Sequence, residues 1–269
     1  YTKFTIKYDK NNNPIEYSCY DIEGKPCYCK DGYAKQKRKY DFRENLSEMS
    51  FYDIEGNLTC NKEGVAMFKY KYDSYGNLVE ISNYDVNGIR CYDRDGIAVS
   101  KWKFDLKGNC IEYLKCDIKG ALTQGSDNYA KLSMKYDKYS RCIEKAYFSD
   151  TCTLIPNNHG VAVEKFIYNK YNKLSETHYY DTLGNPCISD KGISIVKYEN
   201  NSSGLTTKIS NYDIGGNLCC DVYGVAIQTM EYDNHGSIIR LSNYDSYGEI
   251  TYNKELDAYI IETECDKFN

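Results

Sequence analysis

Short runs of β-branched and aromatic residues alternate with polar turn residues along the whole chain. In the segment that starts at Gly64, the runs cover residues 65–72, 78–84 and 89–92, and an Asp-x-x-Gly turn follows each run. The runs show no helix cap and no 3.6-residue apolar spacing, so they predict three β-strands. Asp accepts a hydrogen bond from the backbone two residues on, and Gly adopts positive φ. Asp73 to Gly76 therefore predicts a tight hairpin turn.

The same pattern recurs every 32 residues without insertion. We call the set of residues at one position of every repeat a column. Two columns, mostly of Tyr, divide each repeat into modules of 12 and 20 residues. The first column is Tyr8, Tyr40, Tyr72, Phe104, Tyr136, Tyr168, Asn200 and Tyr232, and the second is Tyr20, Tyr52, Tyr84, Cys116, Phe148, Tyr180, Tyr212 and Tyr244. A constant repeat length indicates that each turn stacks in step with its neighbours.

We therefore predict one repeat array over residues 1–269. Its repeats are 8–39, 40–71, 72–103, 104–135, 136–167, 168–199, 200–231 and 232–263, with partial repeats at both ends. Three strands per repeat would reverse the direction of equivalent strands in neighbouring repeats, so we expect one connection, at the Gly-x-Ala segment, to be a corner. The predicted fold class is all-β: a β-hairpin solenoid or superhelical antiparallel sheet of about eight repeats.

The middle of the array departs most from the pattern. Residues 124–128 replace the usual third turn, and Ser140 and Cys152 stand at the positions of Gly76 and Gly88. Because Gly is the residue that accepts positive φ at little cost, these changes predict a local irregularity near residues 125–160. Pro156 to Gly160 is the expected loop of this irregular part.

Composition excludes some classes of protein. The net charge is −5, with acidic and basic residues interspersed, so no basic stripe for nucleic acid is present. No apolar run approaches the ~20 residues of a membrane-spanning helix. The chain begins at Tyr1 and shows no signal peptide. Its 13 cysteines are scattered over several columns without a C-x-x-C pair, so we interpret them as free thiols that fill apolar space rather than as zinc ligands.

The acidic residues of the turns have two interpretations. Carboxylate ladders bind calcium, but each turn offers one regular carboxylate where calcium takes ~6 to 8 oxygen ligands, so turn capping is the preferred role. No metal or cofactor is predicted. The structural turn residues are Asp53, Gly56, Asp73, Gly76, Asp85, Gly88, Asp213 and Gly216.

A column of Glu (Glu16, Glu48, Glu80, Glu112, Glu144 and Glu176) follows the first aromatic column by eight residues. Lys37, Lys69, Lys101 and Lys165 each precede a Glu (Glu48, Glu80, Glu112 and Glu176) by eleven residues and lie on the preceding predicted strand, directly or diagonally across from it, so we predict a solvated charge ladder. The three histidines, His159, His178 and His235, share no column and have no Ser, Cys or acid partner in a recognised arrangement. No catalytic residue is predicted, and the chain is expected not to be an enzyme.

The chain contains 30 tyrosines, and rings spaced along a repeat array can stack on sugars. Packing of half-buried strands is the alternative role for the same residues. The candidate binding residues are Tyr20, Tyr52, Tyr84, Tyr180, Tyr212 and Tyr244.

The Y-D-x-x-G-N-L modules, such as Tyr52 to Leu58 and Tyr212 to Leu218, resemble the tyrosine-aspartate (YD, or Rhs-type) repeats of bacterial surface and toxin-shell proteins. The resemblance covers nearly the whole chain, with Gly-Asn in place of the family's usual Gly-Arg turn. It implies a spiral of β-strands and a non-catalytic wall or adhesin. We therefore expect a secreted or cell-surface scaffold, structural or adhesive, that assembles end to end into filaments or joins neighbouring repeats of a longer chain. A module that binds cell-wall or host glycans is the alternative.

Overall fold

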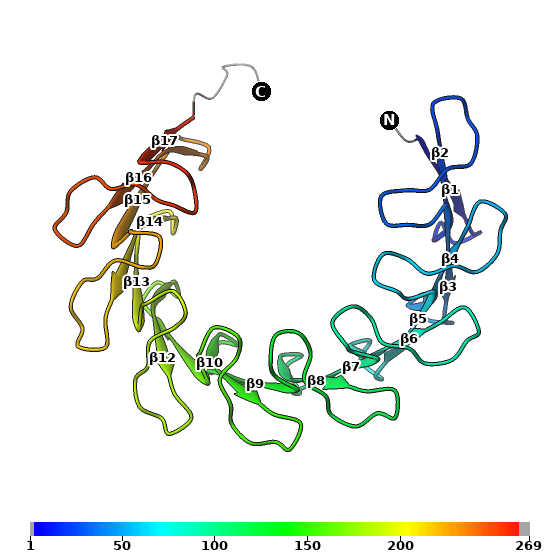
Figure 1. Cartoon of the computed structure of the whole chain (residues 1–269), viewed down its shortest axis with the longest axis horizontal. Helices are drawn as coiled ribbons and strands as arrows, with labels where there is room; N and C mark the ends of the chain where they lie inside the picture. The colour runs from blue at the N-terminus through cyan, green and yellow to red at the C-terminus, as the bar shows by residue number, and fades with distance from the viewer. Residues whose placement is uncertain (1–2, 264–269) are drawn as a thin grey trace. The chain divides into compact units, whose positions relative to one another are not determined.

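A computed structural model describes residues 3–263 (Figure 1). Within these residues the chain forms strands and turns and no helix, which confirms the predicted all-β class. The strands are β1 (Lys3–Tyr8), β2 (Pro14–Tyr20), β3 (Lys35–Tyr40), β4 (Leu46–Tyr52), β5 (Met67–Tyr72), β6 (Leu78–Tyr84), β7 (Val99–Phe104), β8 (Cys110–Cys116), β9 (Lys131–Tyr136), β10 (Cys142–Phe148), β11 (Val163–Tyr168), β12 (Leu174–Tyr180), β13 (Ile195–Asn200), β14 (Thr206–Tyr212), β15 (Ile227–Tyr232), β16 (Ile238–Tyr244) and β17 (Ile260–Glu262).

The chain divides into two compact units. The first comprises Tyr1–Ser133 and Ser149–Thr153, and the second comprises Met134–Phe148 and Leu154–Asn269. Each unit is an open antiparallel sheet in which consecutive strands pair, as Figure 1 shows for β1 to β8 and for β10 to β17. The single array over residues 1–269 stays a prediction.

Each repeat contributes one hairpin to the sheet. β5 and β6 pair from Met67–Tyr84 to Tyr72–Leu78, and β6 then pairs with β7 over a shorter stretch that begins at Glu80–Lys101. The same registers recur in the second unit, for example between β13 and β14 and between β14 and β15. The hairpin is therefore the structural unit, and a shorter ladder joins it to the next.

The predicted third strand is not formed. Of residues 89–92, only Arg90 makes a bridge, to Tyr84, before the chain turns away from the sheet. The reason is that the edge of β6 is occupied: Asn83 donates its N–H to Ala98 O at 2.9 Å, and β7 continues this pairing. With two strands per repeat, equivalent strands run in one direction, so the predicted corner at Gly-x-Ala is also wrong.

Ala of the Gly-x-Ala segment occupies a tight position between two strands. Ala66 donates to Tyr84 O at 2.9 Å and accepts from Phe51 N at 3.0 Å. The side chain is 0% exposed. A larger side chain would have to displace a neighbouring strand, which explains the small residue in this column.

The first turn has the predicted hairpin chemistry. Gly76, at φ 89°, donates to Asp73 O at 3.2 Å, and the ladder shifts register between Lys71 and Tyr72. Asp73 Oδ1 accepts from the N–H groups of Tyr75 and Asn77, both at 2.9 Å, and Asp73 Oδ2 accepts from Asn77 Nδ2 at 2.9 Å. The Asn of the motif therefore completes the cap of the turn.

The turns within residues 125–160 have the regular conformation, so the predicted irregularity is wrong for them. Ser140 and Cys152 both adopt φ 61°, and each donates its N–H to the residue three positions earlier, at 3.1 Å in both turns. Asn128 does the same at φ 66°. Pro156 to Gly160 also ends in the usual bond from Gly160 N to Asn157 O, at 3.0 Å. The surrounding ladders impose the left-handed conformation on residues other than Gly.

Backbone bonds join some of the consecutive third turns to one another. We call residues 29–32, 61–64, 93–96, 125–128, 157–160, 189–192, 221–224 and 253–256 the third-turn loops. Asp190 N donates to His159 O at 2.9 Å, and Val222 N donates to Lys191 O at 3.0 Å. In the first unit, Lys62 N donates to Asp31 O at 2.8 Å. These bonds form a second line of contact beside the sheet.

Gly76→Ala tests the conformational role of the turn glycine. A Cβ at Gly76 would have nothing within 4 Å, so strain at positive φ is the only cost, and we expect a loss of about 1 kcal/mol of unfolding free energy. Ser140→Gly removes that strain, so it should be neutral or should stabilise by up to about 1 kcal/mol. Denaturant midpoints of the two variants measure both effects. Equal shifts in the same direction would contradict the assignment.

Candidate functional site

One face of the sheet carries the charge ladder. Lys37, Lys69, Lys101 and Lys165 lie diagonally across the hairpin from Glu48, Glu80, Glu112 and Glu176, as predicted, because each stands opposite the residue two positions after that Glu. Directly across from them, on the last strand of the preceding hairpin, stand Glu16, Glu48, Glu80 and Glu144. Five close ion pairs are made by a different set of lysines, each nine residues before its Glu, which the sequence analysis missed. They are Lys7–Glu16 at 2.8 Å, Lys39–Glu48 at 2.7 Å, Lys71–Glu80 at 2.8 Å, Lys103–Glu112 at 2.5 Å and Lys135–Glu144 at 2.7 Å.

The predicted tyrosine column lies on the same face and is half-buried in every repeat where it holds Tyr. Lysines of the ladder cover four of the rings. Their ammonium nitrogens lie near the ring centroids in the pairs Lys37–Tyr52 at 4.6 Å, Lys69–Tyr84 at 4.7 Å, Lys165–Tyr180 at 4.6 Å and Lys197–Tyr212 at 4.8 Å. A sugar that stacked on this side of the ring would have to displace the lysine. Binding of glycans by this column stays a prediction.

The predicted turn residues form caps of the kind seen at Asp73. Asp53 Oδ1 accepts from Asn57 N at 2.7 Å, Asp85 Oδ1 accepts from Ile89 N at 2.8 Å, and Asp213 Oδ1 accepts from Asn217 N at 2.8 Å. Gly56, Gly88 and Gly216 all have positive φ. Within residues 3–263, no group of three or more His, Cys, Asp or Glu side chains is arranged to hold a metal ion.

The three histidines remain apart from one another. His159 Nδ1 lies 2.9 Å from Asp190 Oδ2, on the next third-turn loop, and His178 Nε2 lies 2.6 Å from Glu176 Oε2 on the same strand. His235 donates its backbone N–H to Asp233 Oδ1 at 2.8 Å, as part of a turn. The twelve cysteines of the described residues are free thiols, and burial, followed by the nearby Cys29, raises the pKa of Cys19 to about 12.

A buried lysine replaces the usual turn cap in the first unit. Gly125 occupies the position where six of the other third-turn loops hold Asn, Asp or Ser and the first holds Cys29, so its turn has no capping side chain. Lys115, 2% exposed, forms an ion pair with Asp127 on the same loop, and its ammonium lies 3.5 Å from the centroid of the Tyr129 ring. Burial lowers the pKa of Lys115, and Asp127 partly offsets that shift. The ion pair fixes the uncapped loop to the sheet.

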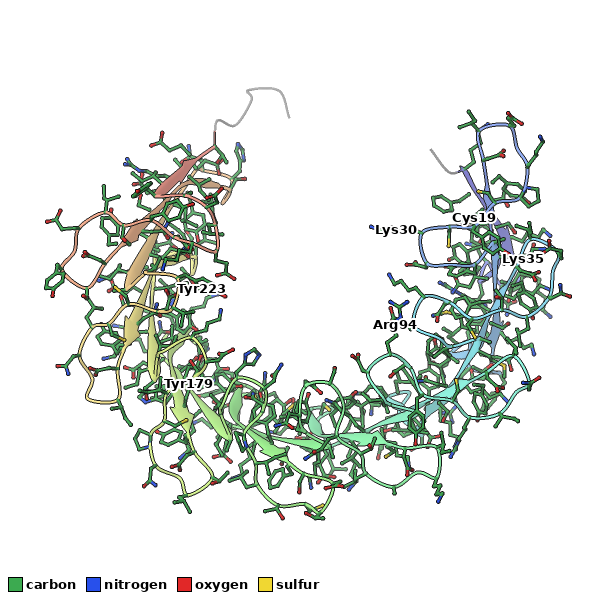
Figure 2. The ribbon with its side chains drawn as sticks, viewed as in Figure 1. Cys19, Lys30, Lys35, Arg94, Tyr179 and Tyr223 are labelled. Atoms are coloured by element: carbon green, nitrogen blue, oxygen red, sulfur yellow. The ribbon has the colours of Figure 1, made fainter. Side chains whose placement is uncertain are left out.

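The second unit contains a groove between the third-turn loops and the opposite face of the sheet. Its volume is about 430 Å³. The sheet side includes Tyr179 on β12 and Tyr198 on β13, and the loop side includes Asp190, Lys191 and Asp221. Figure 2 labels Tyr179 on the sheet and Tyr223 on a third-turn loop of this unit. The sequence analysis did not predict this groove, because its lining residues come from several separate strands and loops.

Comparisons with known proteins give likeness in structure only. No protein-family model and no curated protein matches the chain. The solved structures similar to it include TcdB2-TccC3-TEV (TM-score 0.41, 11% identity, 89% of this chain and 12% of that one) and TcdB2-TccC3 (TM-score 0.40, 11% identity, 94% and 13%). A third is the Tc holotoxin pore of Photorhabdus luminescens (TM-score 0.34, 12% identity, 90% and 13%).

The chain thus spans about an eighth of the length of these toxin chains. Identities and TM-scores this low transfer no activity or partner to it. The structure also contains, within the described residues, no apolar helix of membrane-spanning length.

Asp127→Ala and Lys115→Met test the buried pair. Asp127→Ala leaves the Lys115 ammonium buried without its partner, so we expect a loss of about 2 kcal/mol of unfolding free energy. This is less than for a fully buried ion pair, because Asp127 is 39% exposed. Lys115→Met removes the charge as well and should change stability by less than about 1 kcal/mol. The exposed pair Lys62–Asp31 supplies the control, where Asp31→Ala should cost under ~0.5 kcal/mol. Equal losses for all three variants in thermal unfolding would refute this account.

Glu112 gives the charge ladder a pH dependence. Hydrogen bonds from Lys103 and then Lys131 lower the pKa of Glu112 below its ordinary value of 4.5. Its stabilisation is therefore present above pH 4.5 and is lost as the pH falls through the lower folded-state pKa. Glu112→Gln should remove roughly 0.2–1 kcal/mol at pH 7 and flatten the decline in acid. Glu23→Gln, at an exposed turn, is the control, and denaturation between neutral and acid pH is the measurement.

Proposed function

We propose that the chain is a structural repeat scaffold without enzymatic activity, and that it associates with further copies of itself. The sheet ladder joins each hairpin to the next, ion pairs connect the two strands within a hairpin, and backbone bonds link some of the consecutive third-turn loops. The backbone of these contacts is the same in repeat after repeat, while the exposed side chains vary. Such a chain is built to hold a stiff surface rather than to assemble one pocket of unlike catalytic groups.

A row of aliphatic side chains supports the self-association. Ile22, Ile54, Val86 and Ile118 occupy the same position of the second turn in four consecutive repeats of the first unit, and they are 72, 45, 45 and 39% exposed. Sheet geometry spaces equivalent residues of successive repeats about 10 Å apart, or two strand spacings. A regular row of this kind is self-complementary, because the same row on a second copy has the same spacing.

The exposed side chains of the first turns, which join the two strands of each hairpin, form a less regular row than those of the second turns. Phe42, Tyr75 and Leu106 are strongly exposed, but Tyr75 is third in its turn where the other two are second. The row of second-turn side chains is therefore the surface that carries the proposal. Association through it would be side by side, and the end-to-end filament stays a separate prediction.

Sedimentation velocity over a rising concentration series tests the proposal. We expect the parent chain to form oligomers or filaments, also visible by electron microscopy, and the triple variant Ile22→Ser, Ile54→Ser, Val86→Ser to remain monomeric at the same concentrations. The matched control is Phe42→Ser, Tyr75→Ser, Leu106→Ser, which should still associate. A parent chain that stays monomeric throughout would overturn self-association, and loss of association in the control instead would move it to the first turns.

The place of the scaffold on a bacterial exterior, and an adhesive role there, rest on the resemblance to YD repeats. Antibody labelling of intact cells tests the location. The geometry favours a scaffold over a glycan-binding module of the tyrosine column, because lysines cover four of its rings. Hits on a glycan array that are lost in Tyr180→Ala and Tyr212→Ala would reverse that preference.

A further inference from the structure

A pocket lies between two consecutive first turns of the second unit. Its volume is about 430 Å³, which is within the range of small-molecule sites. We call it the first-turn pocket. Its lining residues are Asn169, Tyr171, Lys173, Asn200, Asn201, Ser202, Ser203 and Gly204. Among these residues there is one ammonium group and no carboxylate.

The equivalent pocket of the first unit has different chemistry. It has a volume of about 460 Å³ and lies four repeats earlier, where Asp41 and Asp73 hold the positions of Asn169 and Asn201. The cap of the first turn is Asp in six of the eight repeats, and Asn169 and Asn201 are the two exceptions. Because these two turns are consecutive, the pocket between them lacks the carboxylates of both caps.

Lysine side chains bring positive charge to the first-turn pocket. Lys173 stands where the first unit has Asn45, and its side chain lies across the next turn. A Cβ at Gly204 would be 2.7 Å from Lys173 Nζ, so this approach requires a glycine. A second ammonium, that of Lys170, lies 4.9 Å from the centroid of the Tyr171 ring. Neither lysine forms an ion pair with a described residue, so both charges are available to a ligand.

The turn that begins at Asn201 also leaves hydrogen-bond donors free. In the other seven first turns, the N–H two residues after the cap donates to Oδ1 of the cap, as Tyr171 N does to Asn169 at 2.9 Å. Asn201 Oδ1 accepts from Leu205 N at 2.9 Å, but the Ser203 N–H makes no bond to a described residue. The exposed hydroxyl of Ser203 is free in the same sense. The pocket therefore presents donors to a ligand.

We propose that the first-turn pocket binds a sugar phosphate. The phosphate oxygens accept from the Lys173 ammonium and from the Ser203 N–H. The hydroxyls of the sugar pair with the side-chain amides of Asn169 and Asn201, whose Nδ2 groups replace the second carboxylate oxygens of the usual Asp caps. This binding role goes beyond the proposed scaffold function and does not depend on it.

The size and polarity of the pocket favour this ligand over simpler anions. A bare phosphate ion would leave most of the volume of about 430 Å³ to water. The hydrocarbon chain of a lipid would meet no apolar side chain in the lining except the ring of Tyr171, which is 70% exposed. A neutral sugar would use the amides and hydroxyls but not the ammonium groups.

Isothermal titration of the full chain with glucose 6-phosphate tests the proposal. We expect saturable binding to one site that weakens as salt is raised. Lys173→Gln and Asn201→Asp should each weaken binding about tenfold, or ~1.4 kcal/mol. Asn201→Asp introduces the residue found at Asp73, so the turn keeps its cap and its fold. Lys119→Gln, at an exposed turn of the first unit, is the matched control and should bind as the parent does.

Three outcomes would overturn the proposal. The first is the absence of saturable heat with glucose 6-phosphate at millimolar concentration, and the second is equal affinity in Lys173→Gln, Asn201→Asp and Lys119→Gln. The third is equal affinity of the parent chain for glucose or for inorganic phosphate, since either would remove one half of the assigned ligand. With a net charge of −5 the chain as a whole repels anions, so non-specific attraction does not imitate a positive result. Sedimentation of the same samples reports the scaffold proposal separately.

Discussion

The structure depends on the pairing of each interior hairpin on both of its sides. The second strand of a hairpin gives one edge to its own first strand and the other to the next repeat, where Asn83 bonds to Ala98 and Glu80 stands across from Lys101. A buried backbone group without a partner is costly, so an insertion in one repeat would break bonds in two. This requirement explains the constant repeat length and the fully buried Ala66 between two strands.

The turns connect the paired strands. Their backbone conformation is constant, while their side chains differ from repeat to repeat. Asp73, Gly76 and Asn77 together satisfy the amides and the positive φ of one turn. Where Ser140 and Cys152 stand in the Gly column, the conformation is the same, because the flanking ladders hold it. Where Gly125 removes a cap, the pair of Lys115 and Asp127 fixes the loop instead. Function can therefore diverge between repeats without loss of the fold.

The two faces of the sheet have different chemistry. One face repeats Glu at one position from Glu16 to Glu176 and has lysines over four of its tyrosines, as in Lys69 over Tyr84, while Lys208 and Arg240 take the Glu position in the last two repeats. The other lies under the third-turn loops and varies from repeat to repeat, with rings such as Phe51 in the first unit and a groove beside Asn211 in the second. The proposed scaffold role rests on the features that recur along the array.

The sequence by itself determined the all-β class, the 32-residue period and the turn chemistry, because these depend on local residue pattern and spacing. It did not determine how many strands each repeat has: residues 89–92 have strand composition, but the neighbouring strand already occupies the edge they would need. It also did not identify Lys71 as the partner of Glu80, because the bulge before Tyr72 sets that register. The groove near Tyr179 was decided only in three dimensions, where residues from separate strands and loops meet.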